Sequence, residues 1–528
     1  MNTKAKKDTE VPVELKDAAD FETAASLTGF GLYNYLILVT SLVSSLSHQF
    51  GASSSSYLLP AAQCDLEMKL SDKGLLNSIS FAGMVATSFL WGFLSDMYGR
   101  RKLLVIAYLL DGTVNFIGSF TQSFAFLVAM KFLSGAIICG PGSIQKTFIS
   151  EFHCVKYRTV IMMLSGFLFA VANIIIPVVA WLIIPNPWSV TFFGGYITYN
   201  SWRVFVAVGS FASFLAALLI YLCPETPKFL MTKGRTEEAL EAFKIMYKYN
   251  TRKNPESYPV KKLTDESYVN MELSTSTDNR KSTCSQIRSG LKEAKRLLVK
   301  PLRNRTIMIV IIQFSTLLSV NTIRLWLPQM FASAEEYIEH HKFMNNTNES
   351  VSMCEMISFT GVSTSSTTSN EEFCGVGMLK NTVYVNNIIV ASSQSICFLL
   401  ASSIVKYIGK KITMVIAYVG AAVCLMSAYW TYSPSSTLAC LALFVSFSSV
   451  SQNTSLATIV DMFPTTVRSM AMSLNTMSSR LGAFSGNLSF PYLLAIDCIA
   501  PFSLLTALVL MCAGITTLLP DTNKVSLQ

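Results

Sequence analysis

The 528-residue sequence predicts an all-α membrane protein with twelve transmembrane helices in two pseudo-symmetric six-helix bundles. Two observations predict this fold. Hydrophobic residues make up 51% of the chain and charged residues only 14%, whereas a soluble protein carries about 25% charged residues. In addition, the segment Gly99 to Tyr108 recurs as Gly409 to Tyr418, which indicates two copies of one unit.

The repeat keeps a glycine, a basic pair and the run Val-Ile-Ala-Tyr in both copies. A second pair of residues has the same offset of 310, because Glu151 and Arg158 are matched by Asp461 and Arg468. Two segments with one common offset are unlikely to arise by chance. Internal repeats of hydrophobic halves are typical of secondary transporters.

The apolar runs are continuous and close to 20 residues long, which favours helices over the alternating strands of a membrane barrel. We predict spans over residues 30–57, 75–96, 102–121, 123–147, 159–184, 203–223, 305–330, 381–404, 411–431, 436–459, 467–494 and 499–519. The N-terminus is polar to about residue 28, so it reads as a tail and not as a cleavable signal peptide.

The resulting domains are a cytoplasmic tail (1–28), a six-helix bundle (29–223), a cytoplasmic linker (224–304), a second bundle (305–520) with an outer loop (331–380), and a C-terminal tail (521–528). Basic residues cluster in the linker, with 17 Lys and Arg against 10 Asp and Glu. The positive-inside tendency therefore places the linker and both termini in the cytoplasm. The outer loop carries two predicted glycosylation sites, Asn345 and Asn348.

Four of the twelve cysteines fall on the outward side, where oxidation is expected: Cys64, Cys354, Cys374 and Cys498. Three pairings are open, and we favour Cys354 with Cys374 because both lie in one loop. The sequence has no metal-ligand spacing, no phosphate-binding loop and no paired catalytic residues. We therefore expect no metal, no cofactor, no enzymatic activity and no nucleic-acid partner.

The segment from Gly92 to Lys102 resembles the G-x-x-x-D-x-x-G-R-R-K signature of the major facilitator superfamily, found between its second and third helices. Pro224 to Leu230 is similar to the P-E-S-P-R-W-L motif of sugar porters. The greatest likeness is to the synaptic vesicle glycoprotein 2-like group, related to organic ion transporters. That likeness rests on residues 21–31, on Leu59-Pro60 and Cys64-Asp65-Leu66, and on the large outer loop. The resemblance implies a central cavity between the bundles and alternating access.

Conformational gating is the expected role of the inner-face motifs. Asp96, at the cytoplasmic end of its helix, can pair with Arg100 and meet the positive end of a helix in the other half. The full set of gating candidates is Gly92, Asp96, Gly99, Arg100, Arg101, Glu151, Arg158, Glu225, Asp461, Arg468 and Arg480. We expect an ion-pair network between the bundles; the alternative is that the basic loops only set orientation. In the second copy, Lys406 stands where the first copy has Asp96. We therefore expect the contact that holds the cytoplasmic side closed to be formed by the first half.

Polar residues inside spans are the candidates for substrate binding, because facing lipid would be costly. They are His48, Lys131, Gln313, Arg324, Gln452 and Asn453. If His48, Lys131 and Arg324 converge, the cavity is electropositive and favours an organic anion. Alternatively, Lys131 and Arg324 extend to the outer headgroups and His48 packs at an interface. Asp111, midway along a span, is a candidate for pairing with Lys131 or for proton coupling.

The segment around Gln313 keeps one glutamine of the sugar-porter Q-Q-x-S-G motif and loses its glycine, which disfavours a hexose substrate. The favoured function is a secondary active or facilitative transporter of a small organic solute, with proton or other ion coupling open. The alternative is a transporter-like receptor or trafficking protein that does not transport. We expect a monomer in the lipid bilayer of the plasma membrane or an intracellular vesicle.

Overall fold

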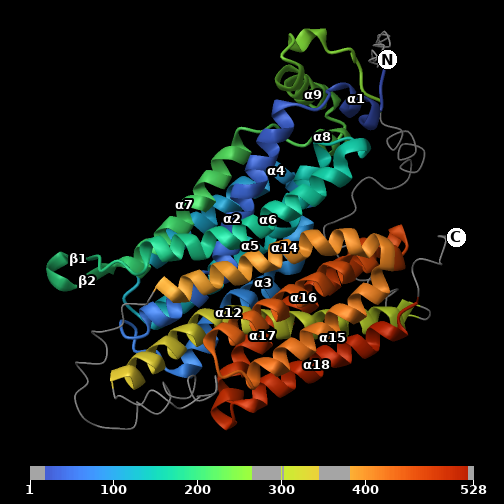
Figure 1. Ribbon diagram of the computed structural model, residues 1–528. Coiled ribbons are helices and arrows are strands. Elements are labelled where there is room, and N and C mark those ends of the chain that lie inside the picture. Colours follow the sequence, from blue (N-terminus) through green and yellow to red (C-terminus); the bar gives the residue numbers. More distant parts are fainter. Residues whose placement is uncertain (1–17, 265–298, 300–301, 344–380, 521–528) are drawn as a thin grey trace, which may run out of the picture.

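The computed structural model describes residues 18–264, 299, 302–343 and 381–520. Twelve long helices dominate these residues (Figure 1). The first six are α2 (Leu32–Ala62), α3 (Leu70–Tyr98), α4 (Arg100–Ser119), α5 (Phe124–Glu151), α6 (Val155–Ile183) and α7 (Ser201–Tyr221). The other six are α12 (Leu302–Phe343), α14 (Asn381–Ile408), α15 (Lys410–Tyr429), α16 (Pro434–Met462), α17 (Thr465–Ile496) and α18 (Ile499–Leu518). The predicted twelve-helix fold is confirmed.

Nine of the described helices are long and apolar enough to cross a membrane, and α2 with the short α1 (Phe21–Leu27) before it makes a tenth. The remaining two long helices, α3 and α17, are not among these ten in the described part of the chain. They pack along each other where the two halves meet, so much of their surface contacts protein instead of lipid.

The observed helices begin and end within a few residues of most predicted spans, but α12 is an exception. The predicted seventh span ends at residue 330, whereas α12 continues to Phe343. Residues 331–343 contain no glycine or proline and include good helix formers such as Ala332 and Glu335, so nothing stops the helix at the edge of its apolar run. The predicted outer loop therefore starts later than expected.

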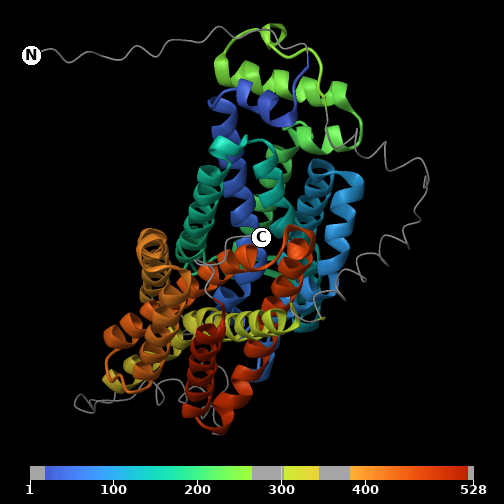
Figure 2. The same cartoon turned by 90° about the vertical axis from the view of Figure 1, so that its right-hand side faces the viewer.

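A small cap covers one end of the N-terminal half (top of Figure 2). It is formed by α1, α8 (Pro227–Thr232) and α9 (Thr236–Thr251). Asn250 of α9 accepts a hydrogen bond from the backbone N–H of Tyr33 at 3.0 Å, and Ala19 pairs with Leu263 in a parallel bridge. We call this end the inner face. The hairpin of β1 (Ser189–Phe192) and β2 (Ile197–Asn200) lies at the opposite, outer face.

The two halves are joined closely toward the outer face. A Cβ added to Gly74 of α3 would lie 2.5 Å from Cγ of Pro491 on α17, so only glycine permits this approach. Nearby, the Asn77 side chain donates a hydrogen bond to the Leu325 carbonyl of α12 at 3.1 Å. On the inner half of α5, by contrast, Lys146 stays exposed. The two halves are therefore in close contact near the outer face.

Candidate functional site

A pocket lies between the halves, formed by α2 and α6 on one side and α12 and α14 on the other. Its empty volume is about 430 Å³, including the part that opens to solvent. The lining residues are Ser53, Ser56, Tyr57, Asn173, Ile176, Arg324, Leu325, Leu327, Asn387, Val390, Ala391 and Gln394.

Arg324 is the one ionised side chain among these lining residues. Its Nε is buried and has no hydrogen-bond partner among the residues that the structure describes. The remaining polar groups are neutral hydroxyls and amides, and Asn173 is held in place because it accepts a hydrogen bond from Gln49. The pocket thus presents one cation, several neutral hydrogen-bonding groups and an apolar wall.

His48 lies on α2 beside the bent segment of α5. Its Nε2 is only 2.5 Å from the position that a Cβ on Gly142 would take, and its ring centroid is 6.1 Å from that of Phe169. The positive charges of Arg480, Lys146 and Arg324 all act on the His48 ring. The structure therefore brings the predicted residues His48 and Arg324 into one electropositive region.

Lys131 belongs to a different cluster, inside the N-terminal half. Its ammonium donates to Ser54 at 2.8 Å and to the Asn115 side chain at 3.5 Å. Asp111 completes this cluster and accepts from Ser134 at 2.6 Å, from Ser213 at 2.7 Å and from Asn115 at 2.9 Å. This placement takes Lys131 out of the pocket lining and links it to Asp111 through the side chain of Asn115.

The other predicted substrate residues do not line the pocket. Gln313 is buried in α12, and its Oε1 has no partner among the described residues. Asn453 is exposed on α16 and donates to the Ser449 carbonyl of its own helix at 2.9 Å. Gln452, its neighbour, is partly buried. None of these three residues is among those that line the pocket with Arg324.

At the inner face, Glu225 caps the N-terminus of α4. Its carboxylate accepts hydrogen bonds from the backbone N–H groups of Arg100 at 3.1 Å and Arg101 at 2.9 Å. Gly99 has φ +93°, and a Cβ there would lie 2.6 Å from Oε2 of Glu225. The glycine of the motif is therefore required both by its backbone conformation and by the cap.

The inner-face ion pairs follow the internal repeat. Arg100 pairs with Glu151 at 3.4 Å, and the residues 310 positions later, Lys410 and Asp461, also pair. Arg158 pairs instead with Glu22 before α2, at 2.7 Å. Each of these pairs joins residues within one half, which corrects the expected network between bundles. Among the described residues, these inner-face charges therefore find their partners within their own half.

Of the remaining gating candidates, Arg480 is the one that the structure shows reaching across the halves. Its Nη1 donates to the Cys139 thiol of α5 at 2.7 Å. Arg468 has a buried Nε without a partner among the described residues. Gly92 is exposed, with open space where a Cβ would lie. The side chain of Asp96 lies outside the described residues.

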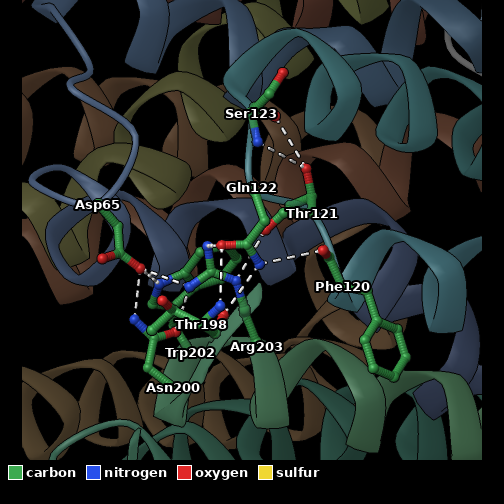
Figure 3. Close-up of polar contacts among 9 residues, drawn as sticks. All are labelled: Asp65, Phe120, Thr121, Gln122, Ser123, Thr198, Asn200, Trp202 and Arg203. Atoms are coloured by element: carbon green, nitrogen blue, oxygen red, sulfur yellow. Dashed lines mark hydrogen bonds and ion pairs between the residues drawn. The ribbon is translucent and has the colours of Figure 1, made fainter. Parts of the chain in front are cut away.

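The outer face of the N-terminal half is held by a polar cluster around Asp65 (Figure 3). Its carboxylate accepts from Trp202 at 2.8 Å and pairs with the buried guanidinium of Arg203 at 2.6 Å. Arg203 also donates to the Thr121 carbonyl at 2.9 Å. Burial alone would raise the pKa of Asp65, but the hydrogen bonds from Trp202, Asn200 and Arg203 outweigh it and lower this pKa.

Oxidation of outward cysteines is seen at two of the four predicted positions, because Cys64 and Cys498 are disulfide-bonded. The favoured pair, Cys354 and Cys374, and the glycosylation candidates Asn345 and Asn348 lie outside the described residues.

Several pocket residues were missed by the sequence analysis. The missed residues that line the pocket are Tyr57, Asn173, Asn387 and Gln394. Lys146, on the inner half of α5, was also missed but is not a lining residue. The signal that could have found Asn173 and Gln394 is a lone amide within an apolar run. That signal is weak, because the spans contain many serines, threonines and amides that only bond to their own helix.

Comparisons with known proteins agree with this architecture. Residues 22–336 match the family described as "Sugar (and other) transporter". The chain is 30% identical to synaptic vesicle glycoprotein 2A of Rattus norvegicus over 239 residues, covering 44% of this chain and 32% of that protein. It is 28% identical to synaptic vesicle glycoprotein 2C of Homo sapiens over 310 residues, covering 55% and 42%. The chain thus spans less than half the length of these relatives.

Among solved structures, the D-xylose-proton symporter superposes with a TM-score of 0.64 at 15% identity, covering 94% of this chain and all of the other. The inward-open xylose transporter XylE from E. coli gives 0.62 at 14%, covering 94% and 98%. At such identity the likeness concerns the fold alone. These proteins are membrane transporters of the major facilitator superfamily and not enzymes. The match over more than half of its length shows that this chain is an integral membrane protein of the Sugar (and other) transporter family.

Proposed function

We propose that this protein transports a small organic anion across the membrane by alternating access, and that Arg324 binds the anionic group. The main observation in support is the pocket between the halves, in which Arg324 is the one ionised lining residue. A guanidinium binds a carboxylate or sulfonate through two parallel hydrogen bonds. The neutral amides and hydroxyls around it can bind the polar remainder of such a solute.

The buried carboxylate of Asp111 is engaged elsewhere and does not line the pocket. Asp111 is enclosed by Ser134, Ser213 and Asn115 within the N-terminal half. The charges of Lys146 and Arg480 act on His48, as that of Arg324 does, so they add positive charge to the region. An anion is therefore attracted to the space between the halves, and a neutral or cationic solute gains nothing from it.

Alternating access is supported by the asymmetry between the two faces. The halves touch closely at Gly74 and Pro491 near the outer face, while the inner ion pairs stay within each half. Opening the outer face requires the inner ends to meet. The inner candidates, Asp96 among them, are proposed to form contacts between the halves in that second state. The basic linker supports a cytoplasmic inner face with both termini.

The test is uptake into proteoliposomes that contain the full chain. We expect saturable accumulation of one or more small carboxylates, lost in Arg324→Gln and partly kept in Arg324→Lys. Lys248→Gln, which changes an exposed charge on α9, is the matched control and should transport normally. Varying the pH gradient tests proton coupling, for which Asp111 is the candidate. Accumulation unchanged in Arg324→Gln would contradict the proposal.

The second candidate is a receptor or trafficking protein with a transporter fold, suggested by the names of the vesicle glycoprotein relatives. It predicts ligand binding without accumulation. Equilibrium binding measured on the same proteoliposomes separates the two, because a transporter accumulates solute beyond the bound amount.

A further inference from the structure

We propose a second anion-binding position between the Arg324 pocket and the inner face, formed by His48, Lys146 and Arg480. One face of α5 organises it. Cys139, Gly142 and Lys146 are spaced by three and four residues, so they lie one above another along that face. All three residues therefore lie on the same face of α5.

Each position on this face contributes a cationic or basic group. Arg480 of α17 contacts the thiol of Cys139 at 2.7 Å. The His48 ring of α2 is packed against Gly142, and its Nδ1 is buried with no hydrogen-bond partner among the described residues. Lys146 supplies its own ammonium and stays exposed. The cluster therefore draws from three helices and from both halves of the protein.

The cluster carries no compensating carboxylate in the described part of the chain. The charge of Arg480 acts on both His48 and Lys146 and disfavours the charged form of each. The nearest acid along α5 is Glu151, which is engaged by Arg100 and by the Thr226 hydroxyl at 2.7 Å. Crowded cations without a counter-charge form a favourable site for a small anion.

The consequence for transport is conformational. Lys146 belongs to the N-terminal half and Arg480 to the C-terminal half, so repulsion between these two charges opposes the approach of the inner ends of the halves. An anion bound among them removes the repulsion and allows these ends to approach. The ligand is a small anion of halide or carboxylate type, either free in solution or the charged group of a solute on its way to Arg324.

The first experiment titrates the purified full-length protein with chloride and, separately, with acetate, and follows thermal unfolding. We expect a saturable rise in Tm with either anion. In Lys146→Gln and in Arg480→Gln the anion concentration for half of the effect should rise about tenfold or more, because a charge-assisted hydrogen bond is lost. Lys146→Arg should restore it. Lys248→Gln reports the general salt effect and should match the wild type.

The second experiment measures the distance between spin labels at Met97 and Tyr407, exposed residues at the inner ends of α3 and α14. Chloride should increase the population with the shorter distance in the wild type and not in Arg480→Gln. Arg324→Gln should keep the chloride response even though it blocks transport, which separates this proposal from the proposed function. A response to acetate but not chloride assigns the site to carboxylates. Equal responses in the wild type and Lys146→Gln would overturn the proposal.

Discussion

The two halves share one backbone plan but fill equivalent interior positions in opposite ways. In the N-terminal half Asp111 and Lys131 are buried in one hydrogen-bonded cluster, with exposed fractions of 1% and 3%. The residues 310 positions later, Ala421 and Leu441, are fully buried and apolar. The same helix packing is therefore stabilised by charged groups in one half and by hydrocarbon in the other.

The features common to both halves lie at the inner helix ends. Gly99 and Gly409 have φ values of +93° and +88°, and Arg101 and Lys411 both donate to the last carbonyls of the packed helices, at Tyr221 and Leu519. Tyr108 and Tyr418 are both buried. The repeat thus preserves the turns that join helices, while the interior of each half has diverged. Among the described residues, most ion pairs lie in the N-terminal half and the segment that follows it.

The largest predicted effect is at Asp111. Asp111 and Lys131 both bond to Asn115, and the Asp111 charge acts on Lys131 across this link. Changing Asp111→Asn leaves the buried Lys131 ammonium without that charge, and an uncompensated buried charge costs up to about 3–5 kcal/mol. We expect a marked fall in the free energy of unfolding, seen as a lower Tm in detergent. The double variant Asp111→Asn with Lys131→Met should be more stable than the single variant, because it removes the unpaired charge.

The matched change in the other half is Ala421→Ser, which adds one small polar group at the equivalent position and should cost about 1–3 kcal/mol. If Asp111→Asn lowers the free energy of unfolding no more than Ala421→Ser does, the charged interior of the N-terminal half is not more important for stability than the apolar interior of the other half. If Asp111→Asn folds normally but loses uptake driven by a proton gradient, Asp111 serves coupling and not stability.

Asp65 gives the next largest effect. Its partner Arg203 is buried, while the Asp65 side chain is 34% exposed, so Asp65→Asn should cost toward the lower end of roughly 3–5 kcal/mol. Because the pKa of Asp65 is lowered from 3.8 in the folded state, its contribution is present at pH above 3.8 and is lost as pH falls through the folded value. The Tm difference between wild type and variant should therefore shrink toward acidic pH, which thermal unfolding at pH 7 and pH 3 measures. A difference that stays constant with pH would contradict the ion pair.

Much of the fold could be predicted because each span is a continuous apolar run and the repeat gives the number of halves. The placement of Lys131 could not. A lysine in a span looks the same whether it faces the cavity or a buried acid, and only packing decides. Likewise, the pairing of Arg100 with Glu151 depends on how the ends of α4 and α5 meet. Sequence identified Arg324 because of its charge, while its neutral neighbours resemble the many other hydroxyls and amides in the spans.

A smaller effect is expected at Glu225, which caps α4 in the N-terminal half. Glu225→Gln keeps one acceptor oxygen but removes the negative charge at a helix N-terminus, which costs about 0.3–1 kcal/mol. A lowering of Tm by a degree or two in thermal unfolding is the expected result. Glu238→Gln, a change to an exposed ion pair on α9, is the control and should leave Tm unchanged. Equal losses in the two variants would show that the cap adds nothing beyond surface charge.

The smallest effect is expected at Asp461. Its ion pair with Lys410 is the equivalent, in the second copy of the repeat, of the pair between Arg100 and Glu151. The Lys410 and Asp461 side chains are 28% and 40% exposed, compared with 15% and 8% in the N-terminal pair. Exposed pairs contribute about 0–1 kcal/mol, so Asp461→Asn should barely change Tm, whereas Glu151→Gln should lower it clearly. Measuring both variants with and without 1 M salt sharpens the comparison, because salt screens the exposed pair and leaves the buried one. Equal losses of stability at Asp461 and Glu151 would show that the two pairs are equally important, and that the halves differ in their interiors but not at their inner ends.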